Sequence, residues 1–199
     1  MTQSEALMTQ EAALPEIAAE DALRADLYDF LAAILARPPG EALLAQTAAL
    51  SGDATRLGEA VTALARVAGV SKPAAVEREF NALFIGLGRG ELLPYASYYL
   101  TGFLNEKPLA GLRRDMAARG ITRAQNVYEP EDNIASLMEM MAGMIRGRFG
   151  KPASLVEQQA FFSKHIGPWA GHFFTDLEAA NSSVLYASVG AVGRVFMEI

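Results

Sequence analysis

Apolar residues in this sequence recur at the spacing of an α-helix, and no segment alternates convincingly between apolar and polar residues as a β-strand would. The clearest run follows the positions i, i+4, i+7, i+8 and i+11 and consists of Val76, Phe80, Leu83, Phe84 and Leu87. This spacing places all five side chains on one face of a helix. Similar runs lie within residues 23–34, 57–64 and 185–196. The sequence therefore predicts an all-α protein.

Clusters of proline, glycine and small polar residues divide the chain into segments of ordinary helix length. Proline has no amide hydrogen and restricts the residue before it, so such a cluster is expected to end one helix or to begin the next. The clusters lie at residues 38–40, 51–53, 86–90, 120–129, 147–152 and 167–168. We expect about ten helices in one domain of residues 18–199, after a loose N-terminal arm of residues 1–17. The break at 120–129 could separate two closely joined lobes.

The charge balance and the lack of cysteine exclude several classes of protein. The formal net charge is -6, and the chain contains no cysteine. A nucleic-acid partner is not expected, because phosphate binding normally shows as a basic surface. Disulfides, thiolate metal sites and a cysteine nucleophile are impossible without cysteine. An acidic chain suits a basic partner, although acidity also serves solubility alone.

The sequence gives no sign of export or of a membrane span. The first basic residue is Arg24, whereas a secretory signal begins with a positive charge followed by an apolar run. The longest uncharged stretch, residues 179–193, is too short and too rich in small polar residues to cross a bilayer. We therefore expect a cytoplasmic protein without membrane insertion.

Catalytic or metal-binding groupings are not evident in the sequence. The two histidines, His165 and His172, stand on either side of Gly167-Pro168, which interrupts the helix that would stack them. No closely spaced set of metal ligands is present. We favour a hydrogen-bonded structural role for each histidine, and we expect no enzymatic activity and no cofactor.

Three glycines, Gly86, Gly88 and Gly90, superficially resemble a phosphate-binding loop. Such a loop needs a strand before it, a helix N-terminus after it and usually a lysine followed by serine or threonine. Here a helix is expected before the glycines, and no such pair follows. A connection between two helices is the better interpretation.

An acidic segment, residues 129–133, precedes an apolar stripe that contains Met138. Pro130 suits a first helical position, and acids in a first turn complement the positive end of the helix dipole. One interpretation is therefore an ordinary acidic helix start. The other is the anionic mouth of a pocket beside a methionine-rich surface, where carboxylates would bind guanidinium groups and thioethers would adapt to an apolar peptide.

Four motifs, read in order, resemble the TorD/DmsD family of redox-enzyme maturation chaperones. They run from about residue 76 to the C-terminus and consist of Phe80 with Leu83-Phe84; Pro94, Ser97 and Tyr99; Glu129-Pro130 with Asp132; and Phe162, His165 and Trp169. Two positions depart from the family pattern: Asn133 replaces a usual histidine, and Ala96 replaces an acid. Asparagine forms hydrogen bonds but does not titrate near neutral pH. Residues 161–180 are most similar to members associated with formate dehydrogenases.

The resemblance implies a non-catalytic chaperone. Members bind the twin-arginine signal peptide and the apo form of a molybdoenzyme, and they delay export until the cofactor is inserted. By resemblance, Asp132 and Glu129 would face the peptide's arginines, and Pro130 and Asn133 would shape the site. The adjoining groove would lie near residues 94–99 and 129–141 and would include Pro94, Ser97, Tyr99 and Met138.

Two other functions and a dimer stay open from the sequence. An assembly factor of the NarJ type would bind a cytoplasmic molybdoenzyme that has no twin-arginine sequence. A weak nucleotide hydrolase would rest on residues 86–90 alone. A homodimer could form by domain swapping if the connection at 120–129 exchanged a C-terminal lobe.

Overall fold

The computed structural model describes residues 17–125 and 127–199, and the all-α prediction is confirmed over this part of the chain. The N-terminal arm predicted for residues 1–17 lies outside the described residues except for Ile17, which is half-buried against the core. The helices are α1 (Ala19–Ala36), α2 (Glu41–Ala48), α3 (Arg56–Val70), α4 (Pro73–Phe80), the π-helical turn η1 (Asn81–Ile85), α5 (Ala96–Thr101), α6 (Lys107–Ala118), α7 (Ile134–Arg146), α8 (Leu155–Phe161), the π-helical turn η2 (Phe162–Ile166), α9 (Ala170–Ala179) and α10 (Leu185–Met197).

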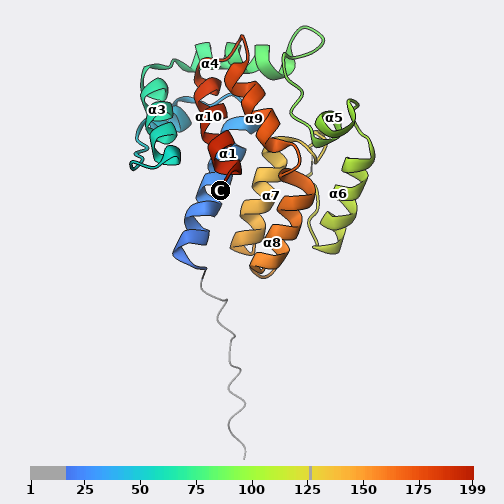
Figure 1. The fold of residues 1–199 in the computed structure, drawn as a ribbon. Helices are drawn as coiled ribbons and strands as arrows, with labels where there is room; N and C mark the ends of the chain where they lie inside the picture. The colour runs from blue at the N-terminus through green and yellow to red at the C-terminus, as the bar shows by residue number, and fades with distance from the viewer. Residues whose placement is uncertain (1–16, 126) are drawn as a thin grey trace, which may run out of the picture.

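Two helix pairs form the centre of the molecule (Figure 1). Helix α1 packs along α7, which comes from a distant part of the chain. Helix α9 packs along α10, which follows it after a short turn. Helices α2 and α3 pack against each other, and α3 also contacts α10. Helix α6 lies at the opposite edge, where it contacts α5, and α4 lies across one end (Figure 1).

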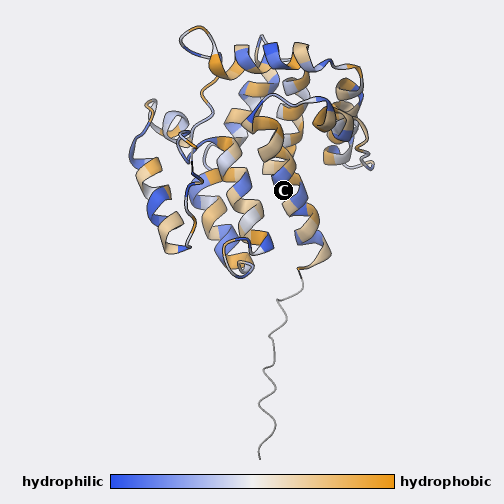
Figure 2. Cartoon of the chain, turned by 180° about the vertical axis from the view of Figure 1, so that it is seen from behind, coloured by the Kyte–Doolittle hydropathy of each residue, from blue (hydrophilic) through white to orange (hydrophobic). Residues whose placement is uncertain are grey.

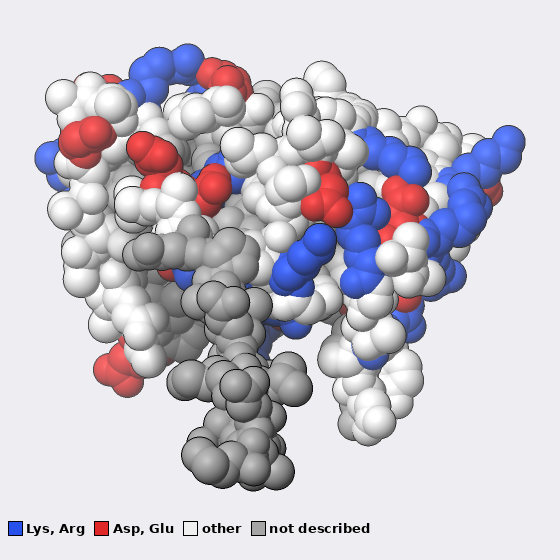
Figure 3. Space-filling view, turned by 90° about the horizontal axis from the view of Figure 1, so that it is seen from below, with Lys and Arg blue, Asp and Glu red and all other residues white. Residues whose placement is uncertain are grey.

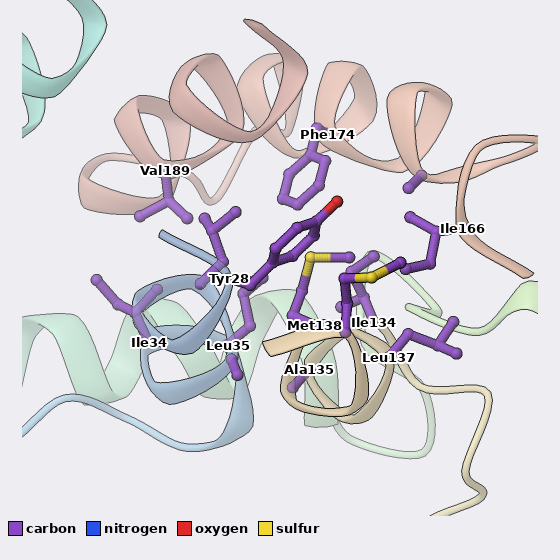
Figure 4. Packing of buried hydrophobic residues seen from close by; sticks show 14 of the residues in the cluster. Tyr28, Ile34, Leu35, Ile134, Ala135, Leu137, Met138, Ile166, Phe174 and Val189 are labelled. Carbon is purple, nitrogen blue, oxygen red and sulfur yellow. The ribbon is translucent and has the colours of Figure 1, made fainter. Parts of the chain in front are cut away.

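The core is filled by the apolar faces of these central helices. In Figure 4, side chains from α1, α7, α9 and α10 point toward a common centre; those with no exposed surface include Ile34, Leu137, Met138, Phe174 and Val189. Seen from behind, the helices carry hydrophobic and hydrophilic residues in alternating patches (Figure 2). This is the pattern of amphipathic helices that bury one side.

The methionines of α7 lie in this core, so the interpretation of this segment as a methionine-rich surface is wrong. Met138 has no exposed surface, and Met140, Met141 and Met144 are buried as well. Helix α7 runs through the middle of the molecule, with α1 on one side and α8 and η2 on another. Flexible thioethers fill the irregular spaces between these helices.

Helix α7 begins later than the sequence suggested. Its first residue is Ile134, and the side chain of Asn133 caps it by accepting a hydrogen bond from the Ala135 amide at 2.9 Å. Pro130 therefore lies in the turn before the helix and not at its first position. Asparagine is among the strongest N-cap residues because its side chain satisfies an amide that has no partner within the helix.

The run from Val76 to Leu87 is helical only as far as η1. Gly86 has φ +62°, and a Cβ atom there would lie 1.9 Å from the Arg89 carbonyl oxygen, so only glycine fits the turn. The chain leaves the helix axis at this point, and Leu87 is fully exposed instead of joining the buried face. The prediction that residues 86–90 connect two helices is confirmed.

None of the helices in the described part of the chain is long and apolar enough to cross a lipid bilayer. The suggested lobe boundary at 120–129 stays a prediction.

Candidate functional site

Two of the sequence motifs, which are about 35 residues apart in the chain, pair directly in space. The Ala96 amide donates to the Asp132 carbonyl at 3.0 Å, and the Ile134 amide donates to the Pro94 carbonyl at 2.9 Å. Tyr95 and Asn133 therefore form an isolated antiparallel bridge. This pairing joins the start of α5 to the start of α7 and places both motifs in one site. The two segments, residues 94–97 and 129–134, are called the paired loops below.

Asp132 is buried between the two helix starts, with 1% of its surface exposed. Its Oδ2 atom accepts a hydrogen bond from the Ser97 amide at 2.8 Å, and it thereby satisfies an amide in the first turn of α5. The Oδ1 atom and the Ser97 hydroxyl are buried and have no hydrogen-bond partner among the described residues. In this arrangement the carboxylate holds the two loops together and does not reach the surface.

Glu129 is the exposed acid of this motif. It accepts a hydrogen bond from the hydroxyl of Tyr95, which belongs to the other paired loop. Burial, and then the neighbouring Glu129 carboxylate, raise the pKa of the Tyr95 hydroxyl well above its ordinary value, so the hydroxyl stays protonated and donates. Glu129 is thus held at the mouth of the site with its charge accessible.

Beside these loops lies a groove of about 610 Å³ between α1, α7 and η1. Its floor consists of small residues from the facing sides of two helices: Ala32, Ala33 and Ala36 of α1, with Ala135 and Ser136 of α7. Phe80, Phe84 and Ile85 form an apolar wall, and Pro94 and Tyr95 line the end near the paired loops. A groove of this size with apolar walls is typical of a ligand or peptide site.

Acidic side chains outnumber basic ones around the groove. Of the described residues that line it, Asp29, Glu129 and Glu139 are acidic and Arg37 is basic. Asp29 and Ala36 are seven residues apart on α1, which corresponds to about 10 Å along the helix. Because α1 and α7 run in opposite directions, Asp29 and Glu139 lie toward one end of the groove, and Glu129 and Asn133 lie toward the other.

The remaining residues predicted for the site lie apart from the groove. The Tyr99 hydroxyl donates to the Asp176 carboxylate at 2.8 Å, and its ring packs on Trp169 at 5.3 Å between centroids. Pro130 is half-buried in the turn before α7, and Met138 lies in the core. Of the predicted residues, Pro94, Glu129 and Asn133 line the groove. Asp132 and Ser97 do not line the groove, but the hydrogen bond between them holds together the two segments beside it.

Sequence reasoning missed the residues that α1 contributes. Alanines such as those at positions 32, 33 and 36 are common in any helix, and a single aspartate such as Asp29 is common on any helix surface. The sequence did contain one signal for a groove: three alanines lie on one face of this helix, and small residues repeated on one face leave room for another group. Nothing in the sequence indicated which helix would face α1.

His165 has the structural role that the sequence favoured. It is 6% exposed, and its Nε2 atom lies 2.7 Å from the Asp115 carboxylate, which also binds Lys164. Because the carboxylate only accepts, Nε2 carries the hydrogen. Burial lowers the pKa of His165 despite the nearby carboxylate, so the neutral ring is favoured. In the described residues, no group of three or more His, Cys, Asp or Glu side chains could hold a metal ion.

The stability of the protein is expected to fall with acidification because of His165. Its folded pKa lies below the ordinary value of 6.5, so the unfolded chain binds more protons over the interval between the two values. The contribution is complete above about pH 6.5 and is lost as the pH falls toward the folded pKa. Thermal unfolding of wild type and His165→Gln between about pH 5 and pH 8 tests this, and the variant should show a flatter profile. His172→Gln, at the exposed second histidine, should keep the wild-type profile; an equal flattening there would contradict the assignment.

Outside the groove, several charged side chains are paired with opposite charges. On the face seen from below in Figure 3, basic side chains lie beside acidic ones. Among the ion pairs of the structure, Glu131 binds both Arg113 and Arg123 at 2.9 and 2.8 Å. Partial burial raises the pKa of Glu131, but these hydrogen bonds outweigh it and bring the pKa below its usual value. Glu131 thus already has two arginine partners, whereas Glu129 is held by the hydroxyl of Tyr95.

Comparison with known proteins agrees with the motifs. The family model described as the nitrate reductase delta subunit matches residues 51–175. Chaperone protein TorD of Vibrio cholerae is 29% identical over 127 residues, which cover 60% of this chain and 58% of that protein. Chaperone protein TorD of Vibrio atlanticus is 28% identical over 129 residues, which cover 61% of this chain and 60% of that protein. The match thus spans less than two thirds of the length of these relatives.

A solved structure supports the fold. The crystal structure of an Archaeoglobus fulgidus protein assigned to redox enzyme maturation superposes with a TM-score of 0.58, and the superposition covers 89% of this chain and 94% of that one. The two sequences are 21% identical, so this likeness concerns the fold alone. The family model, in contrast, covers well over half of the 199 residues and includes the glycine loop, both paired loops and Trp169. The chain therefore belongs to the nitrate reductase delta subunit family, and the TorD-like resemblance indicated by its motifs is confirmed.

Proposed function

We propose that this protein is a non-catalytic maturation chaperone that binds the twin-arginine signal peptide and the apo form of a molybdenum-dependent oxidoreductase. The observation that carries the proposal is the groove of about 610 Å³, which combines apolar walls with carboxylates at its edge. A twin-arginine signal peptide has the complementary chemistry, because a pair of guanidinium groups precedes an apolar stretch. Carboxylates bind guanidinium groups with two parallel hydrogen bonds, and the aromatic wall offers a surface to the apolar part.

In this proposal the residues of the site have distinct roles. Glu129 contacts a guanidinium group directly, since its carboxylate is exposed and held by Tyr95. Asn133 and Pro94 shape the adjoining end of the groove. Asp132 and Ser97 are positioning residues that keep the two loops together. The chaperone would act in the cytoplasm, because the cofactor is inserted before export, and a formate dehydrogenase is the client that the C-terminal motif favours.

Calorimetric titration with the signal peptide of a formate dehydrogenase catalytic subunit tests the proposal. We expect the twin-arginine peptide to bind at least about tenfold more tightly than a variant in which both arginines are replaced by lysine. Both peptides carry the same charge, but lysine cannot form the paired hydrogen bonds of a guanidinium group. Equal affinity for the two peptides would contradict recognition of the arginines by the groove.

A second function is favoured by the description of the matching family. The model is named for the nitrate reductase delta subunit, and the NarJ type of assembly factor serves a cytoplasmic enzyme. In that case the groove would bind a segment of the client that lacks paired arginines. A folded protein that binds neither signal peptide, but that captures an apo-molybdoenzyme in a pull-down, would favour this alternative.

A further inference from the structure

The acidic end of the groove already holds a guanidinium group of the chain itself. Arg148, which follows α7, donates from Nη1 to Oδ1 of Asp29 at 2.8 Å and from Nη2 to Oδ2 at 2.5 Å. Two nitrogens on two oxygens form the bidentate geometry by which carboxylates recognise arginine. Hydrogen bonding to Asp29 raises the pKa of Arg148 above its usual value. Asp29 is therefore placed and oriented to bind a guanidinium group.

The end of α7 brings two arginines to this point. Arg146 is the last residue of the helix, and Gly147 has φ +71°, a left-handed conformation that ends the helix and turns the chain back toward α1. Arg146 donates from Nε to Asp29 at 3.3 Å and also binds Asp26 through Nη2. The segment Arg146-Gly147-Arg148 thus presents two guanidinium groups to the carboxylates of α1.

The charged cluster at this end of the groove has more acidic than basic side chains, and it is partly exposed to solvent. Asp26, Asp29 and Glu139 contribute three negative charges, against the two positive charges of Arg146 and Arg148. Glu139 lines the groove and is close enough to raise the pKa of Arg148 electrostatically. The side chain of Arg148 is 44% exposed and that of Asp29 is 28% exposed. Ion pairs with this exposure contribute little to stability, so an incoming guanidinium group can exchange with Arg148.

We infer that Asp29 and Glu139 form a second guanidinium subsite of the groove, that Arg148 occupies this subsite in the free protein, and that an arginine of the bound peptide replaces Arg148. The inference rests on the proposed function, because it concerns how the same groove recognises paired arginines. Side chains of consecutive residues in an extended peptide point in opposite directions. One arginine therefore reaches Glu129, and the other reaches Asp29 at the far end.

This arrangement makes Arg148 a competitor for the Asp29 contact. A ligand gains that contact only if it replaces the bidentate guanidinium group of Arg148, which a peptide arginine does and a lysine ammonium group does poorly. Competition from Arg148 lowers the affinity for any ligand that reaches Asp29 in proportion to the fraction of molecules in which Arg148 holds the carboxylate. The chain's own arginine thus lowers the affinity of the groove for a twin-arginine peptide, whereas the preference for arginine over lysine comes from the bidentate geometry of the Asp29 contact.

The test compares Arg148→Gln, Asp29→Asn and the double variant by titration with the twin-arginine and twin-lysine peptides. Arg148→Gln should bind the twin-arginine peptide about two- to fivefold more tightly, and its preference for this peptide over the twin-lysine peptide should not fall, because the freed carboxylate favours a guanidinium group. Asp29→Asn should bind the twin-arginine peptide several-fold more weakly. In the Asp29→Asn background, Arg148→Gln should have no further effect, because the contested carboxylate is absent.

Controls separate the inference from a loss of fold and from the proposed function. Arg194→Gln removes an arginine of similar exposure that binds Glu178 at 2.7 Å outside the groove, and it should leave both affinities unchanged. Circular dichroism verifies that each variant is folded, and the Nε–Hε resonance of Arg148 should shift when the twin-arginine peptide is added. Unchanged affinity in Arg148→Gln, or additive effects in the double variant, would overturn the inference while the proposed function stands. If the wild-type protein binds neither peptide, the proposed function is wrong and the subsite with it.

Discussion

Replacing Trp169 with alanine is expected to lower the free energy of unfolding by about 3–5 kcal/mol, the usual cost of truncating a fully buried tryptophan. Trp169 is 1% exposed, and its ring packs against Tyr99 and Phe173 at centroid distances of 5.3 and 6.0 Å. Its Nε1 atom donates to the His165 carbonyl at 2.8 Å, which ties η2 to the start of α9. The substitution leaves both a cavity and a carbonyl without its donor.

Urea unfolding followed by far-ultraviolet circular dichroism measures this effect, because the chain has one tryptophan and the variant loses its fluorescence signal. Trp169→Phe is the matched control, since it keeps an aromatic ring in the cavity and loses only the Nε1 donor. Its loss should be clearly smaller than that of the alanine variant. A loss below about 1 kcal/mol in Trp169→Ala would mean that α9 and η2 do not depend on this side chain.

Replacing Asp132 with alanine is expected to impair both stability and peptide binding. The Ser97 amide would be buried without an acceptor, which costs about 1–3 kcal/mol. The paired loops would also separate more easily, so the positions of Tyr95, Glu129 and Asn133 would vary at the mouth of the groove. We expect twin-arginine peptide binding to weaken about tenfold or more, which corresponds to about 1.4 kcal/mol.

Asp132→Asn decides how this residue acts. Asparagine keeps a carbonyl oxygen that can accept the Ser97 hydrogen bond but has no negative charge. If Asp132 positions the loops, the asparagine variant should bind the peptide within a few-fold of wild type while the alanine variant does not. If Asp132 contacts a guanidinium group directly, both variants should bind weakly. Calorimetry and thermal unfolding of the two variants distinguish these outcomes.

The sequence predicted the helices best where local signals and burial agree. The Pro38-Pro39-Gly40 break follows α1 by one residue, and the apolar stripe of α10 is buried along its whole length. Leu87 is the exception in an otherwise correct run, because the left-handed turn at Gly86 overrides the helical period. Periodicity reports which residues share a face only as long as the backbone stays helical.

For the site, the sequence indicated which loops take part but not how deeply each of their residues is buried. The motifs included residues 94–97 and 132–134, and the structure pairs these two segments. Their pairing buries Asp132 and leaves Glu129 exposed. The sequence does not show this difference, because both residues are acids within the same short motif. The contact between Asp29 and Arg148 joins residues 119 positions apart. It depends on which helix packs against α1, and that is decided by the tertiary structure.

The alanine and serine floor of the groove has a consequence for how a ligand would enter. The hollow exists because two rigid helices carry short side chains where they face each other, and no loop has to open to create it. An empty groove of this kind does not collapse, since the buried residues of α1 and α7 around it fix the distance between the helices. A peptide therefore meets a surface that is already shaped, and most of the ordering on binding falls on the peptide. Relatives could change the shape of their grooves by single methyl groups at these alanine positions without rebuilding the fold.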